Sequence, residues 1–180
     1  LPQLHVTWLC VTLLSVLYFI YCSEMWNQLD ALTGLLNQNS YLNRTAEIRR
    51  SGEVLVVFDV DDFKQVNDRY GHVKGDICLA EIAACIKKAY ARHGYCYRMG
   101  GDEFCVLLRD GDWEHACARD FVRRLDERRK ELDFLPTVSF GSAEISSENV
   151  VTVKDRADHN MYRYKKERKA HRMSGDAGEE

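Results

Sequence analysis

Two adjacent carboxylates follow a pair of glycines in residues 98–104, which read Arg-Met-Gly-Gly-Asp-Glu-Phe. Glycine at both turn positions, Gly100 and Gly101, permits positive φ angles and lets another molecule approach the backbone closely. Asp102 and Glu103 would then lie side by side at the tip of a hairpin. Because neighbouring carboxylates repel each other unless they share a cation, this turn suits a hard ion such as Mg²⁺. An ordinary solvated hairpin with two surface acids is the alternative interpretation.

A third carboxylate, Asp59, directly follows the apolar run Val54–Phe58. Such a run is typical of a strand buried on both faces, and ligand sites gather at the carboxyl edges of such strands. If the hairpin pairs beside this strand, Asp59 converges with Asp102 and Glu103 on one cation. Carboxylates arranged in this way serve metal-assisted phosphoryl transfer. Taken alone, Asp59 has a second interpretation, as a cap at the end of its strand.

The segments that must position these acids alternate between strand-like and helix-like patterns. Strands are indicated by aromatic and β-branched runs, and helices by apolar residues at helical spacing. The expected strands cover residues 54–58, 95–97, 104–108 and 137–143. The expected helices run from the turn at 32–37 to about residue 50, from 76 to 89, over about 112–132 and over about 151–169. This order predicts an α/β (α+β) fold with a mixed central sheet flanked by helices.

The first 23 residues carry no Asp, Glu, Lys or Arg, and they are long and apolar enough to cross a bilayer as a helix. Aromatic side chains near both ends suit the membrane interfaces; they are Trp8, Tyr18, Tyr21 and Trp26. A buried core helix is the main alternative. A signal peptide is disfavoured, because the segment lacks a basic start and a small-residue cleavage site. Arginines after the helix favour a cytoplasmic location for the C-terminal part of the chain; they are Arg44, Arg49 and Arg50.

These patterns divide the chain into four parts. Residues 1–23 form the transmembrane helix, expected to end a longer membrane or sensor region because the chain starts at Leu1. A short connector (24–29), a globular domain (30–171) and a disordered tail (172–180) come after it. Seven cysteines without a C-x-x-C pair argue against a disulfide framework or a zinc site and fit a reducing compartment. The net charge of -3 indicates no nucleic-acid partner.

Five stretches resemble, in order and spacing, the motifs of the GGDEF family of diguanylate cyclases. They are residues 30–37 (DALTGLLN), 58–68 (FDVDDFKQVND), 70–76 (YGHVKGD), 98–104 (RMGGDEF) and 157–165 (ADHNMYRYK). Members of this family convert two GTP into cyclic di-GMP and pyrophosphate. The resemblance spans residues 30–169, so the globular domain is expected to be a GGDEF catalytic domain. It implies a sheet flanked by helices, related to the palm of polymerases and to class III nucleotide cyclases.

The resemblance also implies a metal site. Mg²⁺, with Mn²⁺ as a substitute, would be held by Asp59, the Val60 carbonyl, Asp102 and Glu103. Asp102 would be a metal ligand or the base for the ribose 3′ hydroxyl. The expected catalytic set is therefore Asp102, Glu103 and the phosphate-neutralising Lys64.

GTP would be bound by residues from several of the same motifs. Guanine would hydrogen-bond to Asn67 and Asp76, and Gly100 and Gly101 would make room for the nucleotide. Charge on the phosphates would be neutralised by Lys64, Lys165 and Lys169. On residue types alone, the asparagine and aspartate are also ordinary turn formers, and the basic last helix is also an ordinary solvated face.

The chain departs from the family pattern at three places. An inhibitory product site, Arg-x-x-Asp, often precedes the glycine pair, but here residues 91–94 read Ala-Arg-His-Gly, so no such site is expected. Gln38 replaces a usual arginine at a surface contact. Near the end, a frequent Gly-Arg pair appears as Arg168-Lys169, and lysine lacks the bidentate geometry of arginine.

The function implied is a membrane-tethered diguanylate cyclase. Two domains, each with GTP and Mg²⁺, would face each other in a homodimer, so that each 3′ hydroxyl attacks the other's α-phosphate. The expected location is the bacterial inner (cytoplasmic) membrane, with the catalytic domain in the cytoplasm. A non-catalytic GTP-binding regulatory module is the alternative. A further alternative is an enzyme that makes an adenine-containing cyclic dinucleotide. Asp76, which is expected to bind guanine, argues against this alternative.

Overall fold

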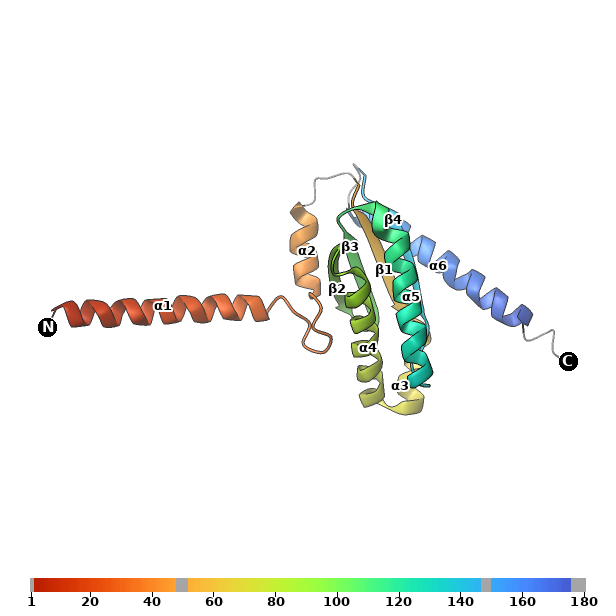
Figure 1. Ribbon diagram of the computed structural model, residues 1–180, viewed down its shortest axis with the longest axis horizontal. Helices are drawn as coiled ribbons and strands as arrows, with labels where there is room; N and C mark the ends of the chain where they lie inside the picture. Colours follow the sequence, from red (N-terminus) through yellow and green to blue (C-terminus); the bar gives the residue numbers. More distant parts are fainter. Residues whose placement is uncertain (1, 48–51, 147–149, 176–180) are drawn as a thin grey trace.

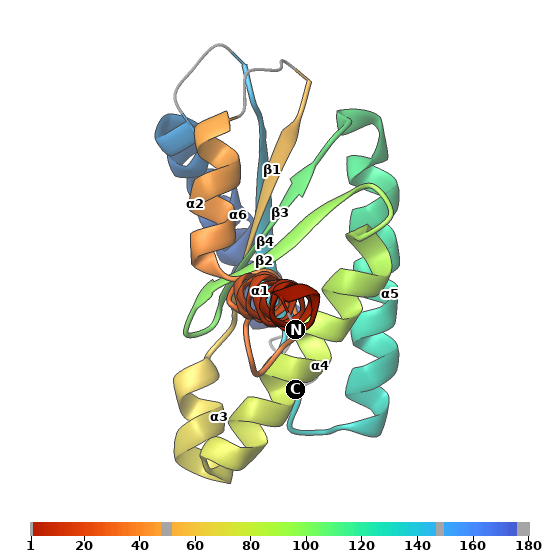
Figure 2. The same ribbon diagram turned by 90° about the vertical axis from the view of Figure 1, so that its left-hand side faces the viewer.

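A four-stranded sheet with the strand order β2-β3-β1-β4 forms the centre of the molecule (Figures 1 and 2). The computed structural model describes residues 2–47, 52–146 and 150–175. Neighbouring strands of the sheet are antiparallel, and an isolated parallel bridge joins Leu36 to Tyr97. The strands are β1 (Val54–Val60), β2 (Gly94–Gly100), β3 (Glu103–Leu108) and β4 (Val138–Glu144).

Helices cover both faces of this sheet, as Figure 2 shows. One face carries α4 (His72–Tyr90) and α5 (Glu114–Glu131), and the other carries α2 (Gln38–Glu47) and α6 (Val150–Gly175). The remaining helical segments are α3 (Phe63–Tyr70), the short 3₁₀ turn η1 (Gly111–Trp113) and α1 (Pro2–Trp26), which projects away from the sheet (Figure 1). The predicted fold class, a sheet flanked by helices, is confirmed, but β1, β2, β3 and β4 pair antiparallel rather than in the predicted mixed arrangement.

Strand β1 is buried on both faces and decides which way the functional acids point. Val56, Phe58 and Val60 belong to the apolar core with α4 and α5. Leu55 and Val57 belong to the second core, with α2 and α6. Because strand side chains alternate between the two faces, the next odd-numbered residue lies on the α6 face. That residue is Asp59, the carboxylate predicted to bind a metal.

Helix α6 packs unusually close to β4 at one point. A Cβ atom on Gly141 would lie 2.2 Å from the backbone nitrogen of Met161 and 2.5 Å from the carbonyl oxygen of Ala157. Real Cβ atoms do not approach backbone atoms so closely, so only glycine permits this contact. The contact fixes the height of α6 above the sheet and therefore the position of any side chain that α6 directs toward β1.

The helix boundaries differ from the prediction in two places. Residues 63–70 form a separate helix, α3, that the sequence patterns did not indicate, and α4 begins at His72 rather than Asp76. Gly71, with φ 81°, separates the two helices. A positive φ angle of this kind interrupts the helical path and suits glycine. The predicted helix end near residue 50 lies outside the described residues.

Helix α1 overlaps the predicted transmembrane helix and extends through Trp26 into the predicted connector. Within the described part of the chain it is the one helix long and apolar enough to cross a membrane, with a mean hydropathy of 1.9 over Val6–Ser23. None of that stretch is buried against the rest of the protein. At the other end, α6 continues to Gly175, so 172–175 of the predicted tail are helical, and 176–180 lie outside the described residues.

Candidate active site

The register between β1 and β3 brings together two of the predicted metal ligands. Asp59 and Glu103 are direct partners across the antiparallel pair. The next pair along the two strands with the same facing, Val57 and Cys105, lies in the core beneath α6. Directly opposed side chains share a face of the sheet and lie within contact range of each other. Both carboxylates therefore face α6 at the end of β1.

The turn between β2 and β3 holds the glycine pair in conformations that other residues rarely adopt. Gly100 has φ 138° and Gly101 has φ 54°. Nothing lies within 4 Å of a Cβ atom at either position, so backbone conformation rather than crowding calls for glycine. The strand register shifts between Arg98 and Gly100, which marks a bulge. Asp102 occupies the turn itself, half-buried, one residue before Glu103.

Arg98 fastens this turn to the segment that comes after α1. Its Nη2 and Nε atoms donate to the Gly101 carbonyl oxygen at 2.8 and 3.2 Å. Its Nη1 atom donates to both carboxylate oxygens of Asp30, at 3.1 and 3.2 Å. Asp30 also accepts hydrogen bonds from the Thr33 backbone N–H at 2.9 Å and the Thr33 hydroxyl at 2.6 Å. Partial burial raises the pKa of Asp30, but the hydrogen bonds from Thr33 and Arg98 outweigh it and lower the pKa overall.

Replacing Asp30 with asparagine should loosen the glycine turn without removing any predicted ligand. The asparagine keeps one acceptor oxygen but loses the charge that holds the guanidinium. We expect turnover to fall by about 10- to 100-fold, since small displacements of a reacting group cost this much. Steady-state rates of the purified chain test the effect. Asp110→Asn is the control, because among the described residues Asp110 accepts a local hydrogen bond from the backbone of Asp112 and forms no ion pair.

Lys165 lies between two carboxylates at the end of β1. Its ammonium nitrogen is 2.5 Å from Oδ2 of Asp59 and 3.3 Å from Oδ1 of Asp61. Burial lowers the pKa of Lys165, but the hydrogen bonds and negative charges of Asp59 and Asp61 outweigh it and raise the pKa overall. The lysine predicted to contact phosphate is therefore held beside the carboxylate predicted to bind the metal.

Asp61 was not among the predicted site residues. It is a buried carboxylate, and it accepts hydrogen bonds from the Thr137 hydroxyl at 2.7 Å and the Ser139 hydroxyl at 2.8 Å. Its backbone N–H donates to the Thr137 carbonyl oxygen. Strand alternation gives the signal that could have found it, because Asp61 directly follows β1 and is two residues beyond Asp59.

Asp158 was also missed, although it borders a small cavity of about 30 Å³ together with Asp59 and Glu103. Partial burial raises the pKa of Asp158, and the negative charges of Glu103 and Asp59 raise it further. Asp158 and Lys165 are seven residues apart on α6, which places them on one helix face two turns apart. That spacing was readable from the sequence.

The residues at this edge fit a divalent metal. The donors are all oxygens, which hard cations prefer, and the carboxylates are close enough to raise the pKa of Asp158. An ammonium group already lies against Asp59 as a cation. Within the described residues, no three His, Cys, Asp or Glu side chains are gathered closely enough to hold an ion by themselves. Ligation by Asp59, Asp102 and Glu103 with the Val60 carbonyl would therefore need these acids to draw closer together, and Asp59 would have to exchange its lysine.

The other predicted nucleotide contacts lie on α3 and α4. Lys64 and Asn67 are three residues apart on α3, and Asp76 is exposed on α4. The two helices meet closely where a Cβ atom on Gly75 would lie 2.0 Å from Oδ1 of Asn67. Asn67 and Asp76 thus belong to adjoining helices. The side chain of Lys169 lies outside the described residues.

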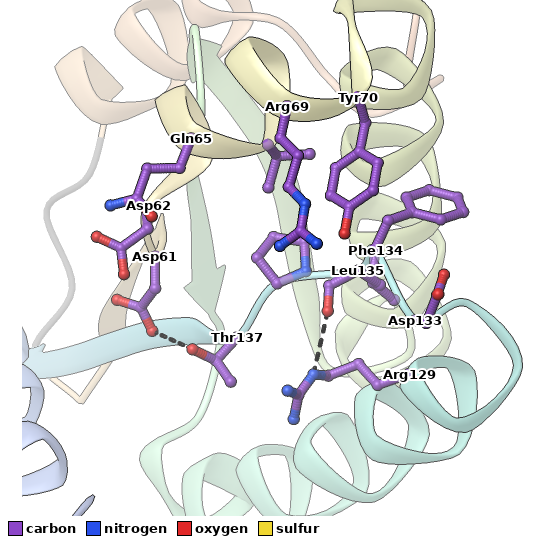
Figure 3. A pocket seen from close by; sticks show the side chains of 12 residues that line it. Asp61, Asp62, Gln65, Arg69, Tyr70, Arg129, Asp133, Phe134, Leu135 and Thr137 are labelled. Carbon is purple, nitrogen blue, oxygen red and sulfur yellow. Dashed lines mark hydrogen bonds between the residues drawn. The ribbon is translucent and has the colours of Figure 1, made fainter. Parts of the chain in front are cut away.

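A larger cavity, of about 320 Å³, lies between α3 and the chain that leads from α5 to β4 (Figure 3). None of the predicted site residues lines it. Asp61 and Thr137 form one wall, joined by their hydrogen bond, while Arg69 and Arg129 extend into it from α3 and α5. Acidic and basic groups are mixed around it, so its charge selects no class of ligand.

Comparison with known proteins identifies the family. The family model "Diguanylate cyclase, GGDEF domain" matches residues 27–171. Diguanylate cyclase DgcS of Shewanella oneidensis is 34% identical over 152 residues, 79% of this chain and 51% of its own length. An uncharacterised signalling protein of Caulobacter vibrioides is 41% identical over 104 residues, 54% of this chain and 13% of its own. The chain thus spans about half the length of these relatives or less.

A solved structure agrees with the observed fold. The coiled coil and GGDEF domain of DgcB from Caulobacter crescentus, crystallised in complex with c-di-GMP, superposes with a TM-score of 0.74 at 26% identity. The match covers 88% of this chain and 92% of that one. The family model, the curated relative and this fold agree with one another. The chain belongs to the GGDEF family of diguanylate cyclases.

Proposed function

We propose that this chain condenses two GTP into cyclic di-GMP and pyrophosphate. The observation that carries the proposal is the direct pairing of Asp59 with Glu103 at the edge of the sheet, with Lys165 against the first of them. Phosphoryl transfer depends on positioning and on neutralising charge. A carboxylate pair for a metal, beside a lysine for phosphate, offers both.

Asp59, the Val60 carbonyl, Asp102 and Glu103 would hold Mg²⁺ or Mn²⁺. The bound metal would polarise phosphate oxygens and neutralise charge as the 3′ hydroxyl attacks the α-phosphate. Asp102 also lies at the turn where it could take the proton from that hydroxyl. The glycine turn, held by Arg98, would orient both of its acids.

The nucleotide would be bound across α3, α4 and α6. Lys64 and Lys165 would contact the phosphates, together with Lys169. Asn67 and Asp76 would read guanine from adjoining helices. The exposed backbone of Gly100 and Gly101, with nothing within 4 Å of either Cβ position, would let the nucleotide lie against the turn.

Each domain would supply one GTP, and two domains would meet with their turns facing, so the homodimer would complete the active site. Helix α1 would anchor the chain in the bacterial inner membrane with the catalytic domain in the cytoplasm. Because α1 ends at Trp26 and Arg98 contacts Asp30, a signal from the membrane would have a short path to the glycine turn.

The experiment is a rate measurement on the purified full chain in detergent. We expect the rate per chain to rise with protein concentration, because two domains must meet. We also expect chelation of divalent metal to stop turnover, and Mg²⁺ or Mn²⁺ to restore it. A rate per chain that is independent of concentration in a monomeric preparation, or turnover that persists without metal, would contradict the proposal.

Replacing Asp76 with serine should relax the choice between guanine and adenine. A carboxylate accepts from the N–H groups of guanine, whereas serine offers a shorter hydroxyl that can donate or accept. We expect the GTP:ATP preference to fall by about tenfold or more, since an unpaired polar group at a recognition site costs over 1 kcal/mol. Competition between the two nucleotides measures it. Asp68→Ser, the same change on exposed α3, is the control, and an unchanged preference in Asp76→Ser would place base recognition elsewhere.

We also propose that the chain lacks product inhibition through an Arg-x-x-Asp site. Gly94 takes the place of the aspartate and is buried. A Cβ atom there would lie 2.4 Å from the Leu107 carbonyl oxygen, so the aspartate side chain would not fit. His93 instead stacks on Trp113, with ring centroids 4.0 Å apart.

A further inference from the structure

Asp61 is a charged group for which the proposed reaction gives no role. Its side chain is 11% exposed, and a buried carboxylate is costly unless it is hydrogen-bonded and paired. The hydroxyls of Thr137 and Ser139 each donate to one of its oxygens, at 2.7 and 2.8 Å. Since both hydroxyls come from β4 and the residue before it, the carboxylate is held in place by the neighbouring strand; Figure 3 shows the Thr137 bond. Each oxygen accepts one hydroxyl and keeps a second lone pair, and Oδ1 also lies 3.3 Å from the Lys165 ammonium.

Lys165, the cation beside Asp61, has a longer and more flexible side chain. Its ammonium lies 3.3 Å from Asp61 and 2.5 Å from Asp59. An ammonium carries three donors at the end of a flexible four-carbon stem. It can therefore move between the two carboxylates while the α6 backbone stays in place. Backbone contacts at Gly141 hold α6 at a fixed height above β4.

We propose that Asp61 is a positioning residue that retains Lys165 at the site when a divalent cation takes Asp59. This inference rests on the proposed function of the site. Without metal, Lys165 neutralises Asp59 as a built-in counter-ion. When metal binds, the ammonium transfers its pairing to Asp61 and stays within reach of the nucleotide phosphates. Asp61 thus lowers the cost of displacing Lys165 and so favours metal binding.

Metal affinity without nucleotide tests the proposal and does not depend on turnover. The probe is Mn²⁺ followed by electron paramagnetic resonance on the full chain in detergent. Lys165→Met removes the competing cation and should tighten Mn²⁺ binding about tenfold. Asp61→Asn leaves the displaced ammonium without a carboxylate and should weaken Mn²⁺ binding about tenfold, a change of about 1.4 kcal/mol.

The double variant separates positioning from simple charge attraction. If Asp61 acts through Lys165, then Asp61→Asn should have little effect in the Lys165→Met background, because the two residues act as one coupled pair. An equal loss of Mn²⁺ affinity on Asp61→Asn in the wild-type and Lys165→Met proteins would overturn the proposal. The effect of Asp61 would then be direct attraction between its charge and the metal. Asp62→Asn removes the same charge from the exposed neighbour, and its φ of 54° suits asparagine. It should leave Mn²⁺ affinity nearly unchanged.

A purely structural role for Asp61 predicts a different pattern. Loss of stability alone would be shared by Ser139→Ala, which removes one hydrogen bond and leaves the carboxylate charge. Thermal unfolding measures that loss independently of metal. If Asp61→Asn does not fold, Lys165→Met still tests the proposal. Unchanged or weaker Mn²⁺ binding in that variant would show that Lys165 does not compete with the metal for Asp59, which overturns the proposal. Failure of the proposed function gives a different result: the Mn²⁺ affinities shift as expected, but no cyclic dinucleotide is formed.

Discussion

Glu103→Gln should reduce turnover at least about 1,000-fold while leaving the fold intact. Glutamine matches the shape of glutamate but carries no charge, and charge stabilisation at a metal-assisted phosphoryl transfer is worth several kcal/mol. Glu103 is exposed at the start of β3, so its loss leaves no buried group unpaired. Product formation from GTP at saturating Mg²⁺ measures the effect, and circular dichroism checks the fold.

Glu127→Gln is the matched control for that experiment. Glu127 pairs with Arg123 on the exposed surface of α5, at 2.7 Å, and exposed ion pairs of this type contribute little. We expect this variant to retain full activity. If Glu103→Gln also retained activity, Glu103 would not be a metal ligand, and the pairing with Asp59 would have no catalytic meaning.

Gly141→Ala should have the largest effect on stability, about 3 kcal/mol or more, because it inserts a methyl group against backbone rather than against a side chain that can turn aside. The nearest atoms are the Met161 nitrogen and the Ala157 carbonyl oxygen, at 2.2 and 2.5 Å. To relieve the clash α6 must move away from β4, which carries Lys165 away from Asp59. The free energy of unfolding, measured by chemical denaturation of the full chain, and GTP turnover should therefore fall together.

Gly111→Ala provides the comparison for this prediction. The closest atom to a Cβ at Gly111 would be a methyl group of Val54, at 3.1 Å, which can adjust. We expect a loss below about 1 kcal/mol for this variant. Equal stability of the Gly141→Ala and Gly111→Ala proteins would show that the α6 contact at Gly141 is not close.

The acids were predictable from sequence because they lie at the ends or turns of strongly patterned strands. An apolar run with a terminal carboxylate predicts β1, and a glycine pair between aromatic and β-branched runs predicts the hairpin. The condition on which their convergence depended is met, because the hairpin pairs beside β1 with Asp59 opposite Glu103. The metal, substrate and catalytic roles of these residues remain proposals.

Helix α3 was missed because its eight residues contain few apolar positions, and Val66 is its one buried residue. Short polar segments look like loops when periodicity is the signal. Helix α3 forms where the chain leaves the sheet edge at the end of β1. Gly71 then ends α3 and redirects the chain into α4. Tertiary packing, rather than local pattern, decides such a helix.

The position of Lys165 could not be predicted, because its contact with Asp59 spans 106 residues. Helical spacing alone puts Lys165 and Asp158 on one face of α6. The neighbours of that face depend on the strand order, which is β2-β3-β1-β4. This order places β4 beside β1, and α6 packs against β4. The ion pair between Lys165 and Asp59 was therefore not predicted, and the phosphate contact of Lys165 stays a proposal.

Nucleotide separation after incubation with GTP and Mg²⁺ tests the central claim most directly. The full chain in detergent is mixed with GTP labelled on the α-phosphate, over a range of protein concentrations. We predict cyclic di-GMP, with two pyrophosphates released for each, and no product in the Glu103→Gln variant. Bound GTP recovered unchanged from the folded wild-type chain, even at high protein concentration, would contradict this claim and would make the chain a non-catalytic GTP-binding module.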